Sequence, residues 1–275
     1  MRESYSDVAA KETSGNRLFN DRTLKWIGVA VAGAFSLGVV AFLAYIVVVQ
    51  VDPSLLVEVV HPQFTDAFVT VLRIVVISSV LSVFAGVIVG LGRVSQTRFT
   101  RTIARGYIEF FRGTPLLFQL MVIFLGVPTF WPPGEFPISN FAIPAAIIGL
   151  TLNHAAYIGE AIRGGIEAVP DGQMEAARSL GLSYIQSMRE VVLPQAWRNA
   201  LAAIGNDQVI LVKDTSLLTI IAVPELISAF RNVNSNNFDA WTPIVIVAVA
   251  YLMITIPLGK IVSYLEARAD PGGRR

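Results

Sequence analysis

Long apolar runs separated by short polar segments form the main pattern of this chain. The first run, 26–51, carries no charged residue, and at about 1.5 Å of helix per residue it is long enough to cross a bilayer. Five more runs follow it: 64–91, 103–127, 141–162, 196–223 and 243–265. The pattern predicts an all-α integral membrane protein with six transmembrane helices.

The first apolar run has a competing interpretation as a cleaved signal peptide. A signal peptide has a short apolar core after a positively charged lead. Here the lead of 25 residues carries charges of both signs, and the apolar run is longer than such a core. We therefore expect a cytoplasmic N-terminal segment over 1–25 and a retained transmembrane helix over 26–51.

Lys and Arg are distributed unevenly between the polar segments. Segments rich in them alternate with segments that have none or one, the rich ones being 1–25, 92–106, 163–198 and the end of the chain from 260, the poor ones 50–63, 128–140 and 224–242. Cytoplasmic loops carry the excess of Lys and Arg. The alternation predicts that both termini, including the tail 269–275, are cytoplasmic, together with 163–195.

Composition supports a membrane protein and narrows the chemistry. Hydrophobic residues make up 54% of the chain and charged residues 15%, with a mean hydropathy of +0.61, whereas soluble domains carry about 25% charged residues. The net charge of +1 gives no reason to expect a nucleic-acid partner. There is no cysteine, and His61 and His154 lie far apart, so neither a thiolate nor a histidine metal site is expected.

The predicted cytoplasmic segment contains a polar element over 171–194. Asp171 is placed to cap a short helix, Gly181 to end or bend it, and Pro194 to break a second short helix before the next span. The element is open to two interpretations. It is either a solvated helical loop or an amphipathic helix that fills a groove on a cytosolic partner.

The spacing inside this element resembles a known signature. The residues that carry it are Glu175, Ala176, Ala177, Gly181, Val191, Leu193 and Pro194. They match EAA-x3-G-x9-I-x-LP, the motif of ATP-binding-cassette (ABC) importer permeases, with Val191 in place of Ile. Three further segments are similar to permeases of polar amino-acid importers: FFRGTPLLFQL (110–120), LTLNHAAYIGEAIRGGIEAVP (150–170) and GNDQVILVKDTSLLTIIAVPEL (205–226).

The resemblance covers roughly 64–268 and implies a five-helix type I importer core. The helix over 26–51 would then be an extra N-terminal span. The resemblance also implies that 171–194 is a coupling element that seats in a cleft of an ATPase subunit. Its expected contacts are Glu175, Ala176, Ala177, Arg178, Gly181, Leu193 and Pro194.

No G-x-x-x-x-G-K-[ST] loop occurs in the chain, so it does not cradle ATP itself. We expect no enzyme activity and no cofactor in this chain, with ATP and Mg bound by a partner ATPase. The resemblance implies two such subunits, an extracytoplasmic binding protein, and a second permease that is either an identical copy or a sister chain. The expected function is import of a polar amino acid by alternating access across the cytoplasmic membrane of a prokaryote.

Polar residues within the apolar runs are candidates for the substrate pathway, because such groups usually face a cavity or the bundle interior. The candidates are Glu160, Asn153, Gln119, Thr114, Gly113 and Arg73. Asn153 and Glu160 lie seven positions apart on nearly one helix face, and Gly113 with Pro115 weakens the helix around it. The alternatives are an ion pair of Glu160 with Arg163, a simple packing kink at Pro115, and an Arg73 that extends toward the membrane surface.

Other polar positions have two interpretations each. Asp207, Lys213 and Asp214 interrupt the run 196–223, which predicts a broken helix with Asp214 or Thr215 capping its second half; they serve either gating or an ion pair of Lys213 with one of the two aspartates. His154 stands where the family more often has a small residue, and it either packs against a neighbouring helix or narrows the choice of substrate. Gly86 and Gly90 predict a close helix contact.

Two rival functions stay open at this point. An ion-coupled secondary transporter would use Glu160 and Asp207 as proton sites and would work without any ATPase. A membrane scaffold or receptor subunit would have no substrate-sized cavity between its spans. Within the importer interpretation, another small amino-acid-like cargo such as an opine is the alternative.

Overall fold

The computed structural model describes residues 21–269, and the chain divides into two compact units, 1–51 and 52–275. The described part of the first unit is the helix α2 (Asp21–Tyr45) with the π-helical turn η1 (Ile46–Gln50). This helix coincides with the apolar run predicted over 26–51. Its side chains are exposed along nearly the whole length, as expected of an apolar helix whose surroundings are lipid.

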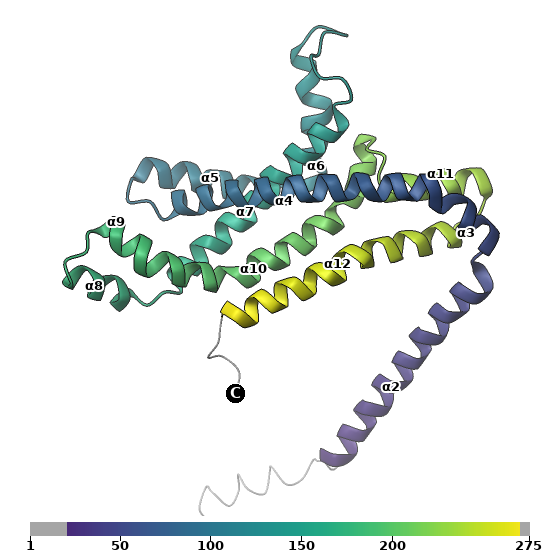
Figure 1. The fold of residues 1–275 in the computed structure, drawn as a ribbon, viewed down its shortest axis with the longest axis horizontal. Coiled ribbons are helices and arrows are strands. Elements are labelled where there is room, and N and C mark those ends of the chain that lie inside the picture. The colour runs from purple at the N-terminus through teal and green to yellow at the C-terminus, as the bar shows by residue number, and fades with distance from the viewer. Residues whose placement is uncertain (1–20, 270–275) are drawn as a thin grey trace, which may run out of the picture. The chain divides into compact units, whose positions relative to one another are not determined.

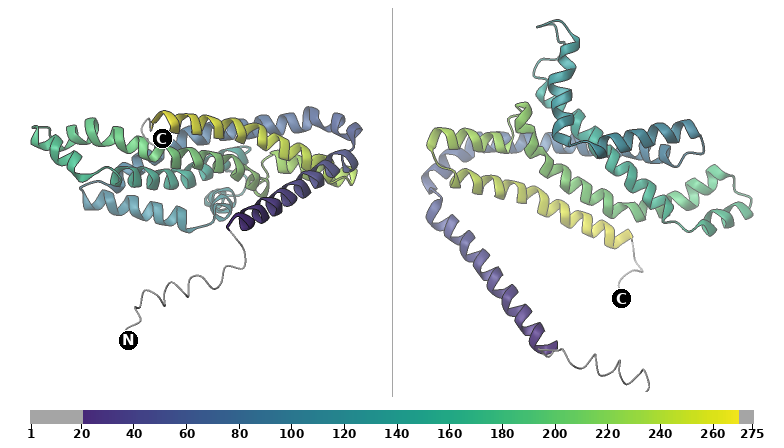
Figure 2. Two further views of the ribbon diagram at one scale, coloured as in Figure 1. Left: turned by 90° about the horizontal axis from the view of Figure 1, so that it is seen from below. Right: turned by 180° about the vertical axis from the view of Figure 1, so that it is seen from behind.

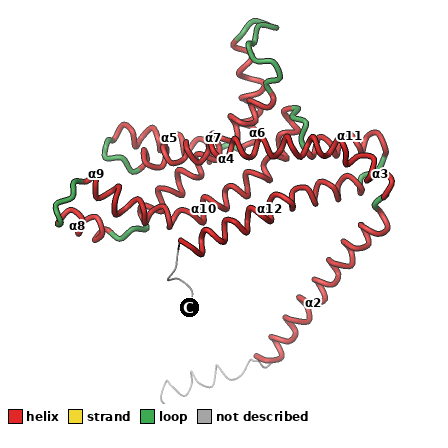
Figure 3. Tube along the Cα trace, viewed as in Figure 1, coloured by secondary structure: helices red, strands yellow, loops and turns green. Residues whose placement is uncertain are grey.

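The second unit consists of helices joined by short loops, and Figure 3 shows no strand among the described residues. In chain order its elements are α3 (Pro53–Val59), η2 (Val60–Phe64), α4 (Thr65–Arg93), α5 (Arg98–Gly113), α6 (Leu116–Met121), η3 (Val122–Gly126), η4 (Val127–Phe130), α7 (Ala142–Glu167), α8 (Asp171–Ser179), α9 (Tyr184–Ser187), η5 (Met188–Val192), α10 (Leu193–Asp214), η6 (Thr215–Ile221), α11 (Leu226–Asn237) and α12 (Trp241–Ala269).

Four long helices form the body of this unit. Helix α7 packs between α4 and α10, and α12 lies along α10 (Figure 1). The short helices α8 and α9 lie at one end of the unit and α11 at the other, as both views of Figure 2 show. The core is made of small and branched side chains from these helices, among them Val71, Ile158 and Leu211, each of which is fully buried.

The predicted small-residue face of α4 is confirmed. A Cβ atom on Gly86 would lie 2.5 Å from Cγ2 of Ile158, and one on Gly90 would lie 2.7 Å from Cβ of Ile162. The two glycines therefore allow α4 and α7 to approach to a distance that any larger residue would prevent.

Within residues 21–269, four helices are long and apolar enough to span a membrane, and five if one bent pair is counted as a span. The bent pair is α5 with the segment Leu116–Phe130, and the two parts meet at 102°. The run 103–127, which was expected as one span, is thus divided into two helices that meet at an angle. The expected span 196–223 corresponds to α10 and η6 and is not among these candidates.

The polar element 171–194 forms the two short helices that were predicted, α8 and α9. Gly181 has a φ of +90°, and the N–H groups of Gly181 and Leu182 bond to the carbonyls of Arg178 and Ala177 at 3.0 and 3.2 Å. This pattern ends α8 with a glycine in the left-handed conformation. Ser183 then caps α9 in a reciprocal arrangement with Gln186.

Two details of that prediction are wrong. Asp171 lies in the first turn of α8 and makes no capping bond, because Pro170 occupies the capping position. Pro194 does not break the helix, because it lies in the first turn of α10 directly after the π-helical turn η5, and the chain stays helical through both. The helical path therefore runs from α9 through η5 into α10 without a break.

Candidate functional site

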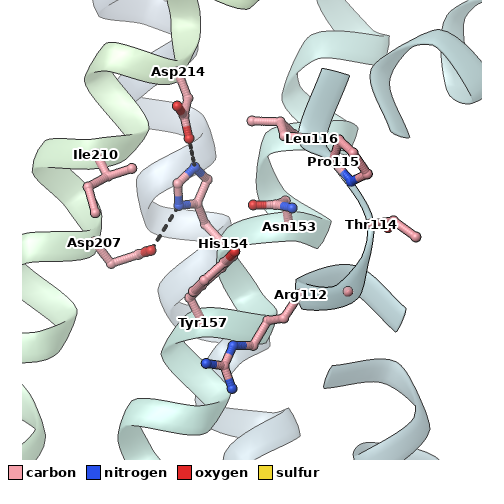
Figure 4. Close-up of a pocket in the computed structure, with 11 residues that line it drawn as sticks. Arg112, Thr114, Pro115, Leu116, Asn153, His154, Tyr157, Asp207, Ile210 and Asp214 are labelled. Atoms are coloured by element: carbon pink, nitrogen blue, oxygen red, sulfur yellow. Dashed lines mark hydrogen bonds and ion pairs between the residues drawn. The ribbon is translucent and has the colours of Figure 1, made fainter. Parts of the chain in front are cut away.

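A pocket of about 420 Å³ lies where α5, α6, α7 and α10 meet. Its volume falls in the range of small-molecule sites, about 300–1,000 Å³. Figure 4 shows the residues around it, which are Arg112, Gly113, Thr114, Pro115, Leu116, Asn153, His154, Tyr157, Asp207, Ile210 and Asp214. Of the predicted substrate residues, the structure brings Gly113, Thr114 and Asn153 together here.

One wall of the pocket is the break between α5 and α6. Thr114 precedes a proline and is extended, with a ψ of 145°, because the ring of Pro115 disfavours the helical conformation for the preceding residue. The break frees carbonyl groups at the end of α5. Irregular backbone of this kind is stable within a membrane only where other groups satisfy it.

Two amide side chains provide those bonds. Gln119 donates to the carbonyls of Phe111 and Thr114 at 2.9 and 3.1 Å. Asn153, from α7, donates to the carbonyl of Phe111 at 3.2 Å and to Gln119 Oε1 at 3.0 Å. Gln119 is buried and does not line the pocket, so its contacts place it behind the wall, while Asn153 belongs to the wall itself.

The opposite wall is a charged cluster that joins α7 to α10. Nδ1 of His154 lies 3.0 Å from Oδ1 of Asp207, and its Nε2 lies 3.4 Å from Oδ2 of Asp214. Only 1% of the His154 side chain is exposed. The ion pair of Lys213 with one of these aspartates, one of the two interpretations of the sequence, does not occur among the described residues; His154 pairs with both aspartates, and Lys213 is exposed.

The helix of 196–223 is broken where predicted, since α10 ends at Asp214 and a tighter 3-10 segment, η6, follows. Neither candidate caps it as expected. Asp214 makes no capping bond with its side chain, and the Thr215 hydroxyl donates back to the carbonyl of Val212 at 2.7 Å.

A third group of charges lies at the α5 end of the pocket. The Arg112 guanidinium lies 5.3 Å from the centre of the Tyr157 ring and 3.6 Å from Oε1 of Glu160. Glu160 pairs more closely with Arg163, at 2.7 Å. Glu160 is therefore paired as in the alternative interpretation, and it does not line the pocket.

Arg73 does not belong to this group. It lies exposed on α4 and is absent from the pocket lining.

The pocket lining also contains Arg112, Tyr157, Asp207 and Asp214, which were not among the predicted substrate residues. Arg112 directly precedes Gly113 in the segment FFRGTP. Its charge next to the predicted helix break is the sequence feature that could have identified it as a pocket residue. The two aspartates were recognised as polar interruptions of an apolar run. Their position opposite Asn153 depends on how α10 packs on α7, which the sequence pattern does not state.

The α8–α9 element presents a second candidate surface. Leu180 and Ile185 are 85% and 75% exposed, and Glu175, Ala176 and Arg178 are exposed beside them. Ala177 is only 4% exposed and holds α8 against the rest of the element. Exposed apolar side chains next to charges on a rigid turn are typical of a docking surface.

The described residues contain no cluster of three or more His, Asp or Glu side chains that is placed to hold a metal ion.

Comparison with known proteins places these features in a family. The family described as "Binding-protein-dependent transport system inner membrane component" matches residues 59–271. The arginine transport system permease protein ArtQ of Bacillus subtilis is 33% identical over 75% of this chain and 92% of its own length. The probable amino-acid ABC transporter permease protein YckA of the same organism is 41% identical over 64% of this chain and 77% of its own length.

A solved structure is also similar. The chain described as an amino acid ABC transporter with histidines superposes with a TM-score of 0.72 and is 33% identical, over 80% of this chain and 99% of that one. The resemblance seen in the EAA spacing is thus supported over most of the chain.

Proposed function

The chain belongs to the family of inner-membrane components of binding-protein-dependent transport systems, and from that premise we propose that it is the permease subunit of an ABC importer for a polar amino acid. The pocket carries this proposal. It has the Arg112 guanidinium at one end and the Asp214 carboxylate at the other, which suits the carboxylate and the ammonium of an amino acid.

We propose the following topology. The chain crosses the membrane six times, with the helix over 26–51 preceding a five-helix core and with both termini in the cytoplasm of a prokaryotic cell. The alternation of Lys and Arg between the polar segments supports this arrangement. It places α8 and α9 on the cytoplasmic side, where an ATPase subunit is accessible to them.

We propose that Gly113, Thr114 and Asn153 contact the cargo and that Gln119 acts through them by holding the break between α5 and α6. Arg112, Tyr157 and Asp214 are added to this set because they line the same pocket. Glu160 has a different role in this proposal. Its pairing with Arg163 and Arg112 orients the Arg112 guanidinium at the pocket.

We propose that α8 is the coupling helix of the importer. Its contacts with a separate ATPase would be Glu175, Ala176, Arg178 and the apolar side chains of Leu180 and Ile185. Closure of two ATPases on ATP and Mg would draw the coupling helices of two permeases together and open the pocket toward the binding protein; hydrolysis would reset it. The short path from α8 through η5 into α10 links this movement to Asp207 and Asp214.

The ion-coupled alternative is less well supported, because its two proposed proton sites are already paired. Asp207 is bonded to His154 and Glu160 to Arg163. An opine is a second candidate cargo. The nopaline transport system permease protein NocM of Agrobacterium fabrum is 34% identical over 80% of this chain.

The test is the ATPase activity of the co-purified complex in lipid, with the binding protein and each of the twenty amino acids added in turn. We expect one or a few polar amino acids to stimulate hydrolysis. Glu175→Lys should abolish the stimulation, because it reverses the charge that α8 offers to its groove. Glu58→Lys, an equal charge reversal at an exposed position of α3, is the matched control and should retain the stimulation. Absence of any co-purifying ATPase would contradict the proposal.

A further inference from the structure

The charges that line the pocket depend on the state of His154. Arg112, Asp207 and Asp214 are the other charged residues of the lining. If His154 is neutral, the lining has a net negative charge and suits a cationic cargo. If His154 is an imidazolium, two positive and two negative groups cancel, and the lining suits a cargo without net charge.

The geometry favours the imidazolium. Each ring nitrogen faces a different carboxylate, at 3.0 and 3.4 Å, and a neutral imidazole has only one N–H to offer. Its other nitrogen would present a lone pair to a carboxylate. The side chain is 1% exposed, so water does little to weaken the interaction between these charges. The remaining ring near His154, Tyr157, lies 6.5 Å away and is uncharged.

We propose that His154 is a built-in cation that takes the place of a positive cargo group between Asp207 and Asp214, and thereby makes the pocket selective for an amino acid without net charge. This inference rests on the proposed function and names the charge class of its cargo. A cargo with a positively charged side chain, such as arginine, would have to place that charge near the His154 imidazolium. Repulsion between two positive charges is strongly unfavourable at a site with little water.

The groups left for such a cargo sit at the two ends of the pocket. Asp214 is 29% exposed, and the Nε2 of His154 that faces it makes no hydrogen bond with a described residue. Its carboxylate is therefore loosely held and accessible to an ammonium group. Asp207, at 9% exposure, is hydrogen-bonded to His154 and Gln208 and is not accessible in the same way.

Arg112 is the counterpart at the other end. Its side chain is 40% exposed, and its contact with Glu160, at 3.6 Å, is longer than a hydrogen bond. Its guanidinium N–H groups thus remain available to bind a carboxylate. A zwitterionic amino acid can therefore bind with its carboxylate at Arg112 and its ammonium at Asp214. No further positive group on the cargo is required to neutralise the lining.

The test measures binding of labelled glutamine, arginine and glutamate to the purified permease–ATPase complex in lipid, without the binding protein, so that only the permease selects. We expect the wild type to bind glutamine more tightly than arginine. His154→Gln removes the charge but keeps a donor for Asp207, and should shift the glutamine-to-arginine preference toward arginine by about tenfold or more. Asp214→Asn should shift binding toward glutamate.

Lys260→Gln is the matched control, because it removes one positive charge from an exposed position on α12 and should change neither preference. A wild type that prefers arginine, or preferences that are unchanged in both pocket variants, would overturn the inference and leave the proposed function standing. If His154→Gln does not assemble, the wild-type preference decides alone: tighter binding of glutamine supports the inference, and tighter binding of arginine overturns it. Absence of any amino-acid binding, together with absence of ATPase stimulation, would overturn both.

Discussion

The amide side chains of Gln119 and Asn153 replace the helical hydrogen bonds that are missing where α5 stops and α6 starts. Both are buried, and both donate to the carbonyl of Phe111. A buried carbonyl without a partner is costly. The pocket wall therefore depends on Gln119, which contacts it from behind, and on Asn153, which is itself part of the wall.

Replacement of Gln119 by Leu tests this dependence. The variant keeps the size of the side chain but removes the donors to Phe111 and Thr114, and we expect it to lower stability by about 1–3 kcal/mol. The measurement is the thermal unfolding of the complex in detergent. Gln63→Leu is the control, since among residues 21–269 the Gln63 side chain makes one long hydrogen bond, 3.5 Å to the carbonyl of Ala229. Equal unfolding temperatures for the two variants would contradict the assigned role.

Local sequence rules predicted the helix break and the glycine turn but not the charged cluster. Proline at 115 and glycine at 181 act on their immediate neighbours, so their effects can be read from a few residues. His154 and Asp207 are 53 positions apart and meet only because α7 packs on α10. From the sequence, Lys213 is the cation nearest to Asp207 and Asp214, so it was the candidate partner for an ion pair. His154 becomes their partner only through the packing of the two helices.

At the scale of the elements, the close contact of α4 with α7 positions the pocket, because α7 supplies Asn153, His154 and Tyr157. Gly86 faces Ile158, and Gly90 faces Ile162. Gly165, seven residues after Ile158 and so on nearly the same face of α7, lies against the backbone of Ala196 on α10, with 2.5 Å between the carbonyl oxygen and the place of a Cβ atom. Glycines on α4 and α7 thus allow α7 to lie close to its two neighbours.

Gly86→Ala tests the closeness of that contact. The added methyl group would lie 2.5 Å from Ile158, and relief of such overpacking typically costs about 1–3 kcal/mol. We expect a lower unfolding temperature and weaker cargo binding, because α7 has to move. Gly106→Ala on α5 is the matched control. No atom lies within 4 Å of its added methyl group, and alanine favours the helix there. A destabilisation equal in both variants would argue against tight α4–α7 packing.

At the scale of the whole molecule, the features that point to transport lie in one of the two units. Every residue that lines the pocket belongs to 52–275, as do α8 and α9. The family match also begins after the first unit, at residue 59. The helix over 26–51 therefore lies outside the part of the chain that the proposed mechanism uses.

A chain that lacks residues 1–51 should still assemble with its ATPase and respond to cargo. Its orientation in the membrane should be preserved, because the Arg-rich segment 92–106 remains and sets the sides of the neighbouring spans. The measurement is cargo-stimulated ATPase activity in lipid, compared with the full chain. In a second variant, 26–51 is replaced by a leucine run of equal length. This variant keeps an apolar span for membrane insertion but removes any contacts that depend on the native side chains of the first helix. If the leucine variant inserts normally and yet loses stimulation, the first helix takes part in transport and the importer cannot be described by its second unit alone.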